Sequence, residues 1–211
     1  MKLITTSVIA LALAATPAFA GNKTKHKAQS ENAAQNQKAD LDLAASNLSW
    51  EGTKVTGKHA GKVKVSKGYL ETKNNQVIGG QFEVDMNSIT NEDLTDKTYN
   101  DKLIGHLKSE DFFNVAKFPS ATFKIKSVAP KVTDKGTHEV IGDLTIKGAS
   151  HPISFPATIV IGDGKIEAKG TAVVDRTLWN IRYGSGKFFK GLGDKVINDT
   201  FTVVIDIVAR K

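Results

Sequence analysis

The chain contains no cysteine among its 211 residues. It therefore forms no disulfide, offers no thiolate to a structural zinc site, and cannot carry the lipid-modified cysteine of a lipoprotein. Its fold has to be stabilised by the hydrophobic core alone.

The common catalytic signatures are also missing. The five histidines form no HxH, HxxxH or HExxH pair; they are His26, His59, His106, His138 and His151. Ser185 lies in YGSGK, which lacks one glycine of the GxSxG elbow, and GKFFKGLGDK lacks the GK[ST] order of a phosphate loop. No local motif predicts a zinc hydrolase, a serine hydrolase or a nucleotide-binding site, and no metal site is expected.

No apolar run is long enough to cross a bilayer. The longest, residues 3–15, is shorter than the roughly 20 residues that a transmembrane helix needs. Lys2 precedes it and Ala18-Phe19-Ala20 follows it, which predicts a secretory signal peptide over residues 1–20. We expect a periplasmic or secreted protein.

Large apolar side chains are nearly absent from residues 21–39, which are rich in Asn, Gln, Ala and Lys. Such a segment cannot bury enough surface to fold, so a disordered spacer is predicted there. Residues 40–211 then form a single domain.

The net charge of +7 does not indicate a nucleic-acid-binding protein. Lys2 and the four lysines of segment 21–39, offset by Glu31, account for more than half of it. Lysines of the domain alternate with apolar residues, as in GKVKVS, which is typical of the outer face of a strand rather than a nucleic-acid site. Weak attraction to anionic membranes is left open.

Period-two alternation is the main signal in residues 40–211, and it predicts strands. The apolar face is clear in GQFEVDM, ATFKIKS, VIGDLTIKG, PATIVIG, KIEAKGTAVV and TFTVVIDIVAR. Asn74-Asn75 and the glycine-containing turns near residues 136 and 164 suit tight hairpins. The prediction from these patterns is an all-β antiparallel fold of about eight strands, either a sandwich or an up-and-down barrel.

One segment, about residues 91–110, has helical spacing instead. Asn91 is the expected N-cap, and the helix is expected to cross an opening of the sheet. Small residues share the inward face of a late strand, namely Ala168, Gly170 and Ala172. They predict either an internal cavity or large side chains opposite that fill the space.

The stretch GHLKSEDFFNVAKFPSATF gathers catalytic residue types around His106. A helix end that caps its own backbone, with phenylalanines entering the core, explains it better than catalysis, because Ser109 is poorly placed for a Ser-His dyad and no oxyanion-hole motif is present.

The order of five segments resembles the YceI-like, polyisoprenoid-binding family. These segments are KHAGKVKVSKGYL, GGQFEVDMNSI, HLKSEDFFNVAKFPSATF, GDLTIKGASHPISFP and DRTLWNIRYGS, and they cover most of residues 48–205. The resemblance implies a lipocalin-like barrel, partly closed by a helix, whose deep apolar cavity binds a long isoprenoid chain or a related amphiphilic lipid.

The function expected from this resemblance is sequestration or transport of such a lipid, for example an isoprenoid quinone or its precursor, in the cell envelope. We expect no enzymatic activity, no cofactor and no nucleic acid, and leave a homodimer open.

The alternatives are a calycin-like enzyme using His106 as a base, and a solidly packed structural or stress-response protein. For Arg176, the alternative to ligand contact is an ion pair with Asp175 or another carboxylate. For Trp179, the alternative is packing in the core. The candidate cavity or mouth residues are His59, Phe82, Val84, Met86, Leu103, His106, Leu107, Phe112, Phe113, Phe123, Ala168, Gly170, Ala172, Arg176, Trp179, Arg182, Tyr183, Phe188 and Phe189.

Overall fold

The computed structural model describes residues 36–162 and 164–211. The predicted signal peptide and residues 21–35 of the predicted spacer lie outside that range. The expected start of the domain at residue 40 needs a correction, because strand β1 begins at Gln37. Ala39 is fully buried, and Gln37 lies opposite Thr72 of a neighbouring strand. Backbone pairing and burial of Ala39 thus bring residues 37–39 into the sheet.

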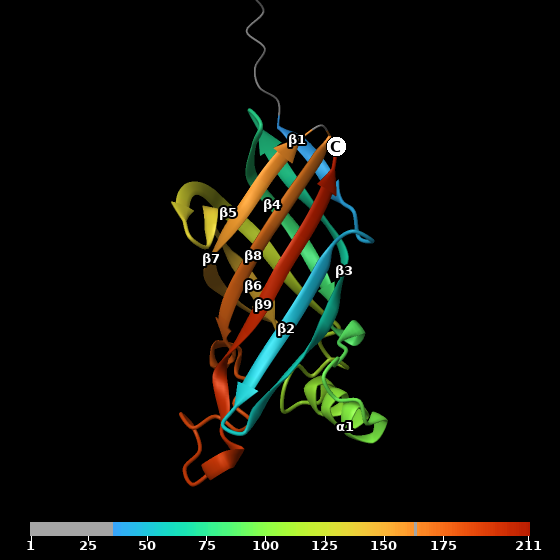
Figure 1. The fold of residues 1–211 in the computed structure, drawn as a ribbon, viewed down its shortest axis with the longest axis vertical. Coiled ribbons are helices and arrows are strands. Elements are labelled where there is room, and N and C mark those ends of the chain that lie inside the picture. Colours follow the sequence, from blue (N-terminus) through green and yellow to red (C-terminus); the bar gives the residue numbers. More distant parts are fainter. Residues whose placement is uncertain (1–35, 163) are drawn as a thin grey trace, which may run out of the picture. The chain divides into compact units, whose positions relative to one another are not determined.

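Within the described residues the fold consists of nine strands and one α-helix (Figure 1). The strands are β1 Gln37–Leu41, β2 Asn47–Lys54, β3 Gly57–Lys73, β4 Gln76–Asp85, β5 Ser120–Thr133, β6 Gly136–Ile146, β7 Ala149–Gly162, β8 Lys165–Asp175 and β9 Ile197–Arg210. The helix is α1 Lys97–Lys108, and short 3-10 helices are η1 Met86–Ser88, η2 Arg176–Trp179 and η3 Gly193–Lys195.

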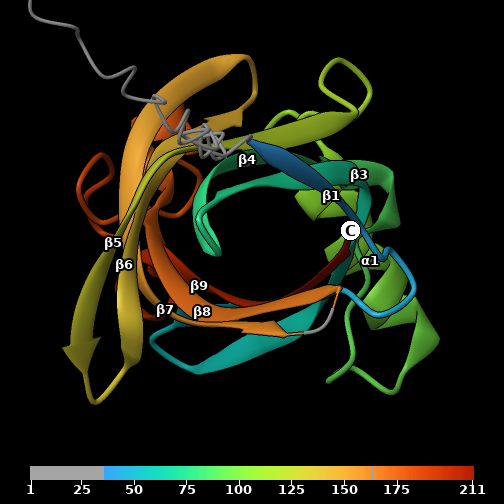
Figure 2. The same ribbon diagram turned by 90° about the horizontal axis from the view of Figure 1, so that it is seen from above.

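The sheet closes on itself. Strands β2 to β9 form an antiparallel ring in which β3 pairs with both β2 and β4, and β9 pairs with both β8 and β2. Strand β1 pairs with β3 and β9 beyond the end of β2. Figure 2 shows this ring from above. Closure leaves few unpaired strand edges, and it confirms the predicted barrel.

The predicted inward faces are confirmed along the strands. Val174, Ala172 and Ile166 of β8 are at most 3% exposed, while Val173 between the first two is 63% exposed. The tight turn between β3 and β4 is confirmed as well, because Asn74 and Asn75 both have positive φ. Asparagine tolerates this conformation, which a two-residue hairpin turn requires.

Two inward glycines are covered by phenylalanine rings. A Cβ atom on Gly142 would lie 2.5 Å from the ring of Phe123, and one on Gly170 would lie 3.2 Å from the ring of Phe155. Part of the space predicted from small residues is therefore filled by large side chains of adjacent strands.

Candidate ligand-binding cavity

Helix α1 and the turn after it lie at the end of the barrel opposite the C-terminus (Figure 1). The helix is shorter than predicted, and its N-cap is Asp96 rather than Asn91. The Asp96 carboxylate accepts hydrogen bonds from the amides of Thr98 and Tyr99. Asn91 is buried instead, and its side-chain amide donates to the carbonyl of Ala60, which ties the segment before the helix to β3.

The turn after α1 directs two phenylalanines toward the barrel. The amide of Phe113 donates to the carbonyl of Leu107 over 3.1 Å, and the amide of Asn114 donates to the carbonyl of Ser109 over 2.8 Å. Phe112 is buried, and both phenylalanines line an internal cavity. The hydroxyl of Ser109 also donates to the carbonyl of His106 over 2.8 Å, so a polar side chain of HLKSEDFF caps the helix end, as expected.

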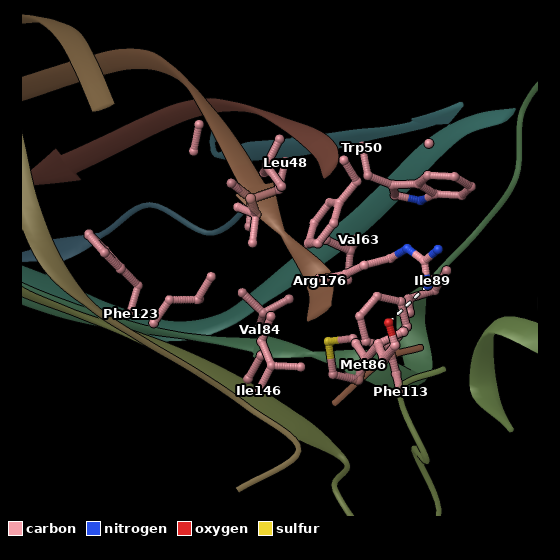
Figure 3. Close-up of a pocket in the computed structure, with 18 of the residues that line it drawn as sticks. Leu48, Trp50, Val63, Val84, Met86, Ile89, Phe113, Phe123, Ile146 and Arg176 are labelled. Carbon is pink, nitrogen blue, oxygen red and sulfur yellow. Dashed lines mark hydrogen bonds between the residues drawn. The ribbon is translucent and has the colours of Figure 1, made fainter. Parts of the chain in front are cut away.

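The cavity has a volume of about 180 Å³, counted as space open to the centres of water-sized molecules. Figure 3 shows labelled residues from β2, β3, β4, β5 and β6 around it, together with Phe113 and Arg176. Besides the predicted residues, the lining includes Leu48, Trp50, Gly52, Val63, Ile89, Ala121, Leu144, Ile146, Ile153, Phe155, Val174, Ile181, Ile197, Asn198, Thr200, Phe201, Val203 and Ile205. Nearly all of this surface is apolar, so the cavity suits hydrocarbon.

A layer of three aromatic rings forms the inner end of the cavity. The centroids of Phe82 and Phe123 are 5.5 Å apart, and those of Phe123 and Phe155 are 5.7 Å apart. Beyond them a second space of about 40 Å³ shares these three residues as lining. The phenylalanine layer therefore separates the main cavity from the rest of the barrel interior.

Arg176 is the only charged residue among the described residues that line the main cavity. Its side chain is 5% exposed, and its guanidinium donates to four backbone carbonyls over 2.9–3.1 Å. The acceptors are the carbonyls of Ile181, Tyr183, Ile197 and Asn198. Burial lowers the pKa of Arg176, while nearby carboxylates oppose that effect. Because four of its five N–H donors are occupied by these carbonyls, Arg176 anchors the chain between β8 and β9 rather than presenting a free charge to the cavity.

Two carboxylates flank this guanidinium. The Asp199 carboxylate lies 3.6 Å from the guanidinium of Arg176. The ion pair of Arg176 is therefore with Asp199 and not with Asp175. Burial raises the pKa of Asp175, but hydrogen bonds from the hydroxyl and amide of Thr177 outweigh it, so the pKa is lowered from its usual value.

Just over half of the predicted site residues line one of the two spaces. Phe82, Val84, Met86, Leu107, Phe112, Phe113, Phe123, Ala172 and Arg176 line the main cavity, while Ala168 and Gly170 line the smaller one. Outside both linings lie His59, Leu103, His106, Trp179, Arg182, Tyr183, Phe188 and Phe189.

The residues outside the linings have other contacts. His59 lies 2.8 Å from the Asp93 carboxylate on the outer surface, and His106 lies 3.1 Å from that of Asp111. The ring of His106 also packs edge-on against Tyr183, which joins the end of α1 to the chain after β8. Trp179 is 1% exposed and donates to two backbone carbonyls, so core packing describes it.

The prediction omitted about two thirds of the residues that line the main cavity. Alternation already placed Val63, Leu144, Ile146, Val174, Phe201, Val203 and Ile205 on inward faces, so they could have been included. Trp50 lies on β2 between Leu48 and Gly52, which line the cavity in the same two-residue alternation. Ile89 and Ile181 carried no periodic signal, because they lie in irregular segments between the strands.

A closed antiparallel barrel with an apolar internal cavity is the architecture of lipocalin-like binding proteins. Residues 40–209 match the YceI-like domain family, and the chain belongs to that family. A protein of the UPF0312 group from Ectopseudomonas mendocina is 45% identical over 60 residues, which are 28% of this chain and 30% of the relative. One from Shewanella denitrificans is 38% identical over 92 residues, which are 43% of each chain. The matched segments thus span less than half of these relatives.

Solved structures agree on the fold. BcnA of Burkholderia cenocepacia superposes with a TM-score of 0.62 at 26% identity, over 81% of this chain and 99% of BcnA. A domain from Saccharophagus degradans, described as polyisoprenoid binding and implicated in plant cell wall breakdown, gives a TM-score of 0.58 at 16% identity, over 82% of this chain and 97% of that one. At that identity the second likeness shows the fold alone.

Within residues 36–162 and 164–211, no helix has the length and apolar character needed to cross a bilayer. The same residues contain no group of three or more His, Asp or Glu side chains placed to hold a metal ion.

Proposed function

We propose that this protein holds the hydrocarbon chain of a polyisoprenoid, or of a related amphiphilic lipid, inside its barrel, for sequestration or transport. The main cavity carries the proposal. Its described lining is almost wholly apolar, and its one charged side chain already donates to backbone carbonyls. A bound group with polar atoms would leave them unpaired there, whereas a hydrocarbon chain makes no such demand.

The energetics favour a prenyl chain as ligand. Burying roughly 200 Å² of hydrocarbon at about 25 cal/mol per Å² contributes about 5 kcal/mol before the cost of ordering the chain. A longer prenyl chain buries more hydrocarbon surface and so gains more binding free energy. Affinity should therefore increase with chain length until the chain reaches the phenylalanine layer. Binding of this kind requires no cofactor. The description of the Saccharophagus degradans domain as polyisoprenoid binding adds support from a protein of the same fold.

Binding accounts for the site better than catalysis does. The residue proposed as a base for an enzyme, His106, lies outside the cavity lining and is paired with Asp111. A base in that position does not reach a substrate held among the apolar side chains. We also propose that the protein acts in the periplasm or outside the cell, on the basis of the signal sequence over residues 1–20.

The experiment is a fluorescence titration with geranylgeraniol, a defined twenty-carbon isoprenoid alcohol. Of the two tryptophans, Trp50 lines the cavity and Trp179 does not. We expect a saturable change in emission that Trp50→Phe removes and Trp179→Phe preserves. Isopentenol, with one isoprene unit, serves as the control ligand and should bind far more weakly. Absence of a saturable change, together with no isoprenoid in organic extracts of protein purified from its native host, would refute the proposal.

A further inference from the structure

The chain between β8 and β9 forms an exposed loop at the same end of the barrel as α1 (Figure 1). We call residues 182–195 the basic–aromatic loop. It contains one arginine, three lysines and a single acidic residue, namely Arg182, Lys187, Lys190, Lys195 and Asp194. The neighbouring Phe188 and Phe189 are 38% and 49% exposed.

The two phenylalanines are held outward by an anchored turn. Ser185 is fully buried, and its carbonyl accepts hydrogen bonds from the amides of Phe188 and Phe189 over 3.2 and 3.0 Å. The Arg182 guanidinium lies 4.5 Å from the centre of the Phe188 ring. Exposure of two adjacent aromatic side chains to water is unfavourable in free energy. Exposed apolar groups of this kind mark a surface that binds a partner.

Among the described residues, the positive side chains of the loop form no ion pairs, although Lys187 is close enough to Asp175 to help lower the pKa of that carboxyl. On the barrel wall, Lys62, Lys126 and Lys169 pair with carboxylates over 2.7–3.1 Å. Within the part of the chain that the structure describes, no ion pair involves Arg182, Lys187, Lys190 or Lys195. The loop therefore combines free cationic charge with exposed aromatic surface, the pairing that anionic lipid interfaces attract.

The loop is continuous with the cavity. Ile181 and Ile197, which flank it on either side, both line the main cavity. The amide of Val55, which is 62% exposed at the tip of the β2–β3 hairpin, donates to the carbonyl of Val196. This places another exposed apolar side chain next to the loop, at the end of the barrel where the cavity lies.

We propose that the basic–aromatic loop docks on the surface of an anionic phospholipid bilayer. Phe189 enters the interface between headgroups and acyl chains, and Lys187 and Lys190 contact the phosphate groups. Docking brings the cavity end of the barrel to the membrane, where an amphiphilic ligand resides. The proposal goes beyond ligand binding and does not depend on it, because docking requires no molecule in the cavity.

The test is flotation of the protein with vesicles of phosphatidylcholine alone or mixed with phosphatidylglycerol. We expect binding only to the mixed vesicles, and loss of binding as salt is raised, since the Debye length falls from about 10 Å at 0.1 M to about 3 Å at 1 M. The double variant Lys187→Glu/Lys190→Glu should lower the partition coefficient at least tenfold. The matched control is Lys73→Glu/Lys135→Glu, which makes the same charge change at exposed lysines of two other hairpins; it should retain most of the binding.

The aromatic contribution has its own variants. Phe189→Ser should weaken binding several-fold, Phe189→Trp should preserve it because tryptophan favours the interface, and Val132→Ser at an exposed valine of the β5–β6 hairpin should have no effect. Equal binding to both kinds of vesicle, or an equal loss in the control double variant, would overturn the proposal. Geranylgeraniol titration of the Lys187→Glu/Lys190→Glu variant should match the wild type, so failure of docking and failure of ligand binding are told apart.

Discussion

Substituting Ala172 by phenylalanine tests the cavity most directly. Ala172 is 3% exposed, lies opposite Val203 in the β8–β9 pairing, and lines the main cavity. A ring added at this position therefore enters the space that we assign to the ligand. The substitution changes no charge and removes no hydrogen bond of the barrel.

The size of the cavity sets the expected effect on stability. A cavity of about 150 Å³ lined by aliphatic and aromatic side chains accommodates benzene, so about 180 Å³ admits a phenyl ring. Burial of the ring should then stabilise the ligand-free protein by up to about 1.5–3 kcal/mol. At about 2–4 °C per kcal/mol for a domain of this size, the melting temperature should rise by several degrees.

Ala157→Phe provides the matched control. Ala157 is 2% exposed and lines the smaller space of about 40 Å³, which cannot admit a ring without displacement of its neighbours. Overpacking of this kind costs typically about 1–3 kcal/mol, so this variant should melt at a lower temperature than the wild type.

Thermal melting and geranylgeraniol titration are the two assays. Ala172→Phe should melt at or above the wild-type temperature and lose most of its affinity for geranylgeraniol. If instead it melts several degrees lower, as Ala157→Phe should, the interior is packed and the cavity is not available to a ligand. Unchanged melting with unchanged affinity would show that the ligand binds elsewhere.

Three further predictions concern the cavity floor, the buried arginine and the response to acid. Phe123→Ala should join the two internal spaces, cost about 3–5 kcal/mol in the free energy of unfolding measured with urea, and shift the preference of the cavity toward longer isoprenoid alcohols. Arg176→Met should cost at least about 3 kcal/mol because four backbone carbonyls lose their donor, whereas the exposed Arg182→Met should change stability by less than about 0.5 kcal/mol in the same urea titration. Asp93→Asn should lower the urea midpoint at pH 7, and this difference should shrink as the pH falls through the acid range.

The Asp93 prediction follows from the sign of its pKa shift. Burial raises the pKa of Asp93, but hydrogen bonds from the amide of Ala60, from His59 and from Asn91 outweigh it, so the pKa in the folded protein is lowered. The carboxylate therefore contributes stability above its unfolded pKa of about 3.9, and this contribution is lost as the pH falls through the lowered value. A gap between wild type and Asp93→Asn that persists unchanged at pH 2 would contradict this assignment. Similarly, a Phe123→Ala protein with unchanged chain-length preference would show that the phenylalanine layer does not limit the ligand.

Strand alternation is a local property, so the sequence predicted the antiparallel strands and their inward faces, whereas the choice of a barrel over a sandwich came from the family resemblance. Ala172, Val174 and Phe82 face inward as their two-residue period requires, and the hairpin asparagines take positive φ as their residue type allows. The helix was harder to delimit, because Asn91 and Asp96 are both good capping residues. Asn91 instead donates to the carbonyl of Ala60, a contact across 31 positions that no local pattern indicates.

Alternation thus determined the fold class, the inward face of each strand and the apolar character of the interior, since each depends on residues a few positions apart. How much of that interior stays empty was decided by tertiary structure. Phe123 covers Gly142 and Phe155 covers Gly170, so the smallest residues of the lining do not mark the largest space. The main cavity lies nearer α1, where Phe113, Ile181 and Trp50 meet from segments far apart in the chain. The volume between side chains depends on the packing of all of them at once, and no local pattern in the sequence encodes it.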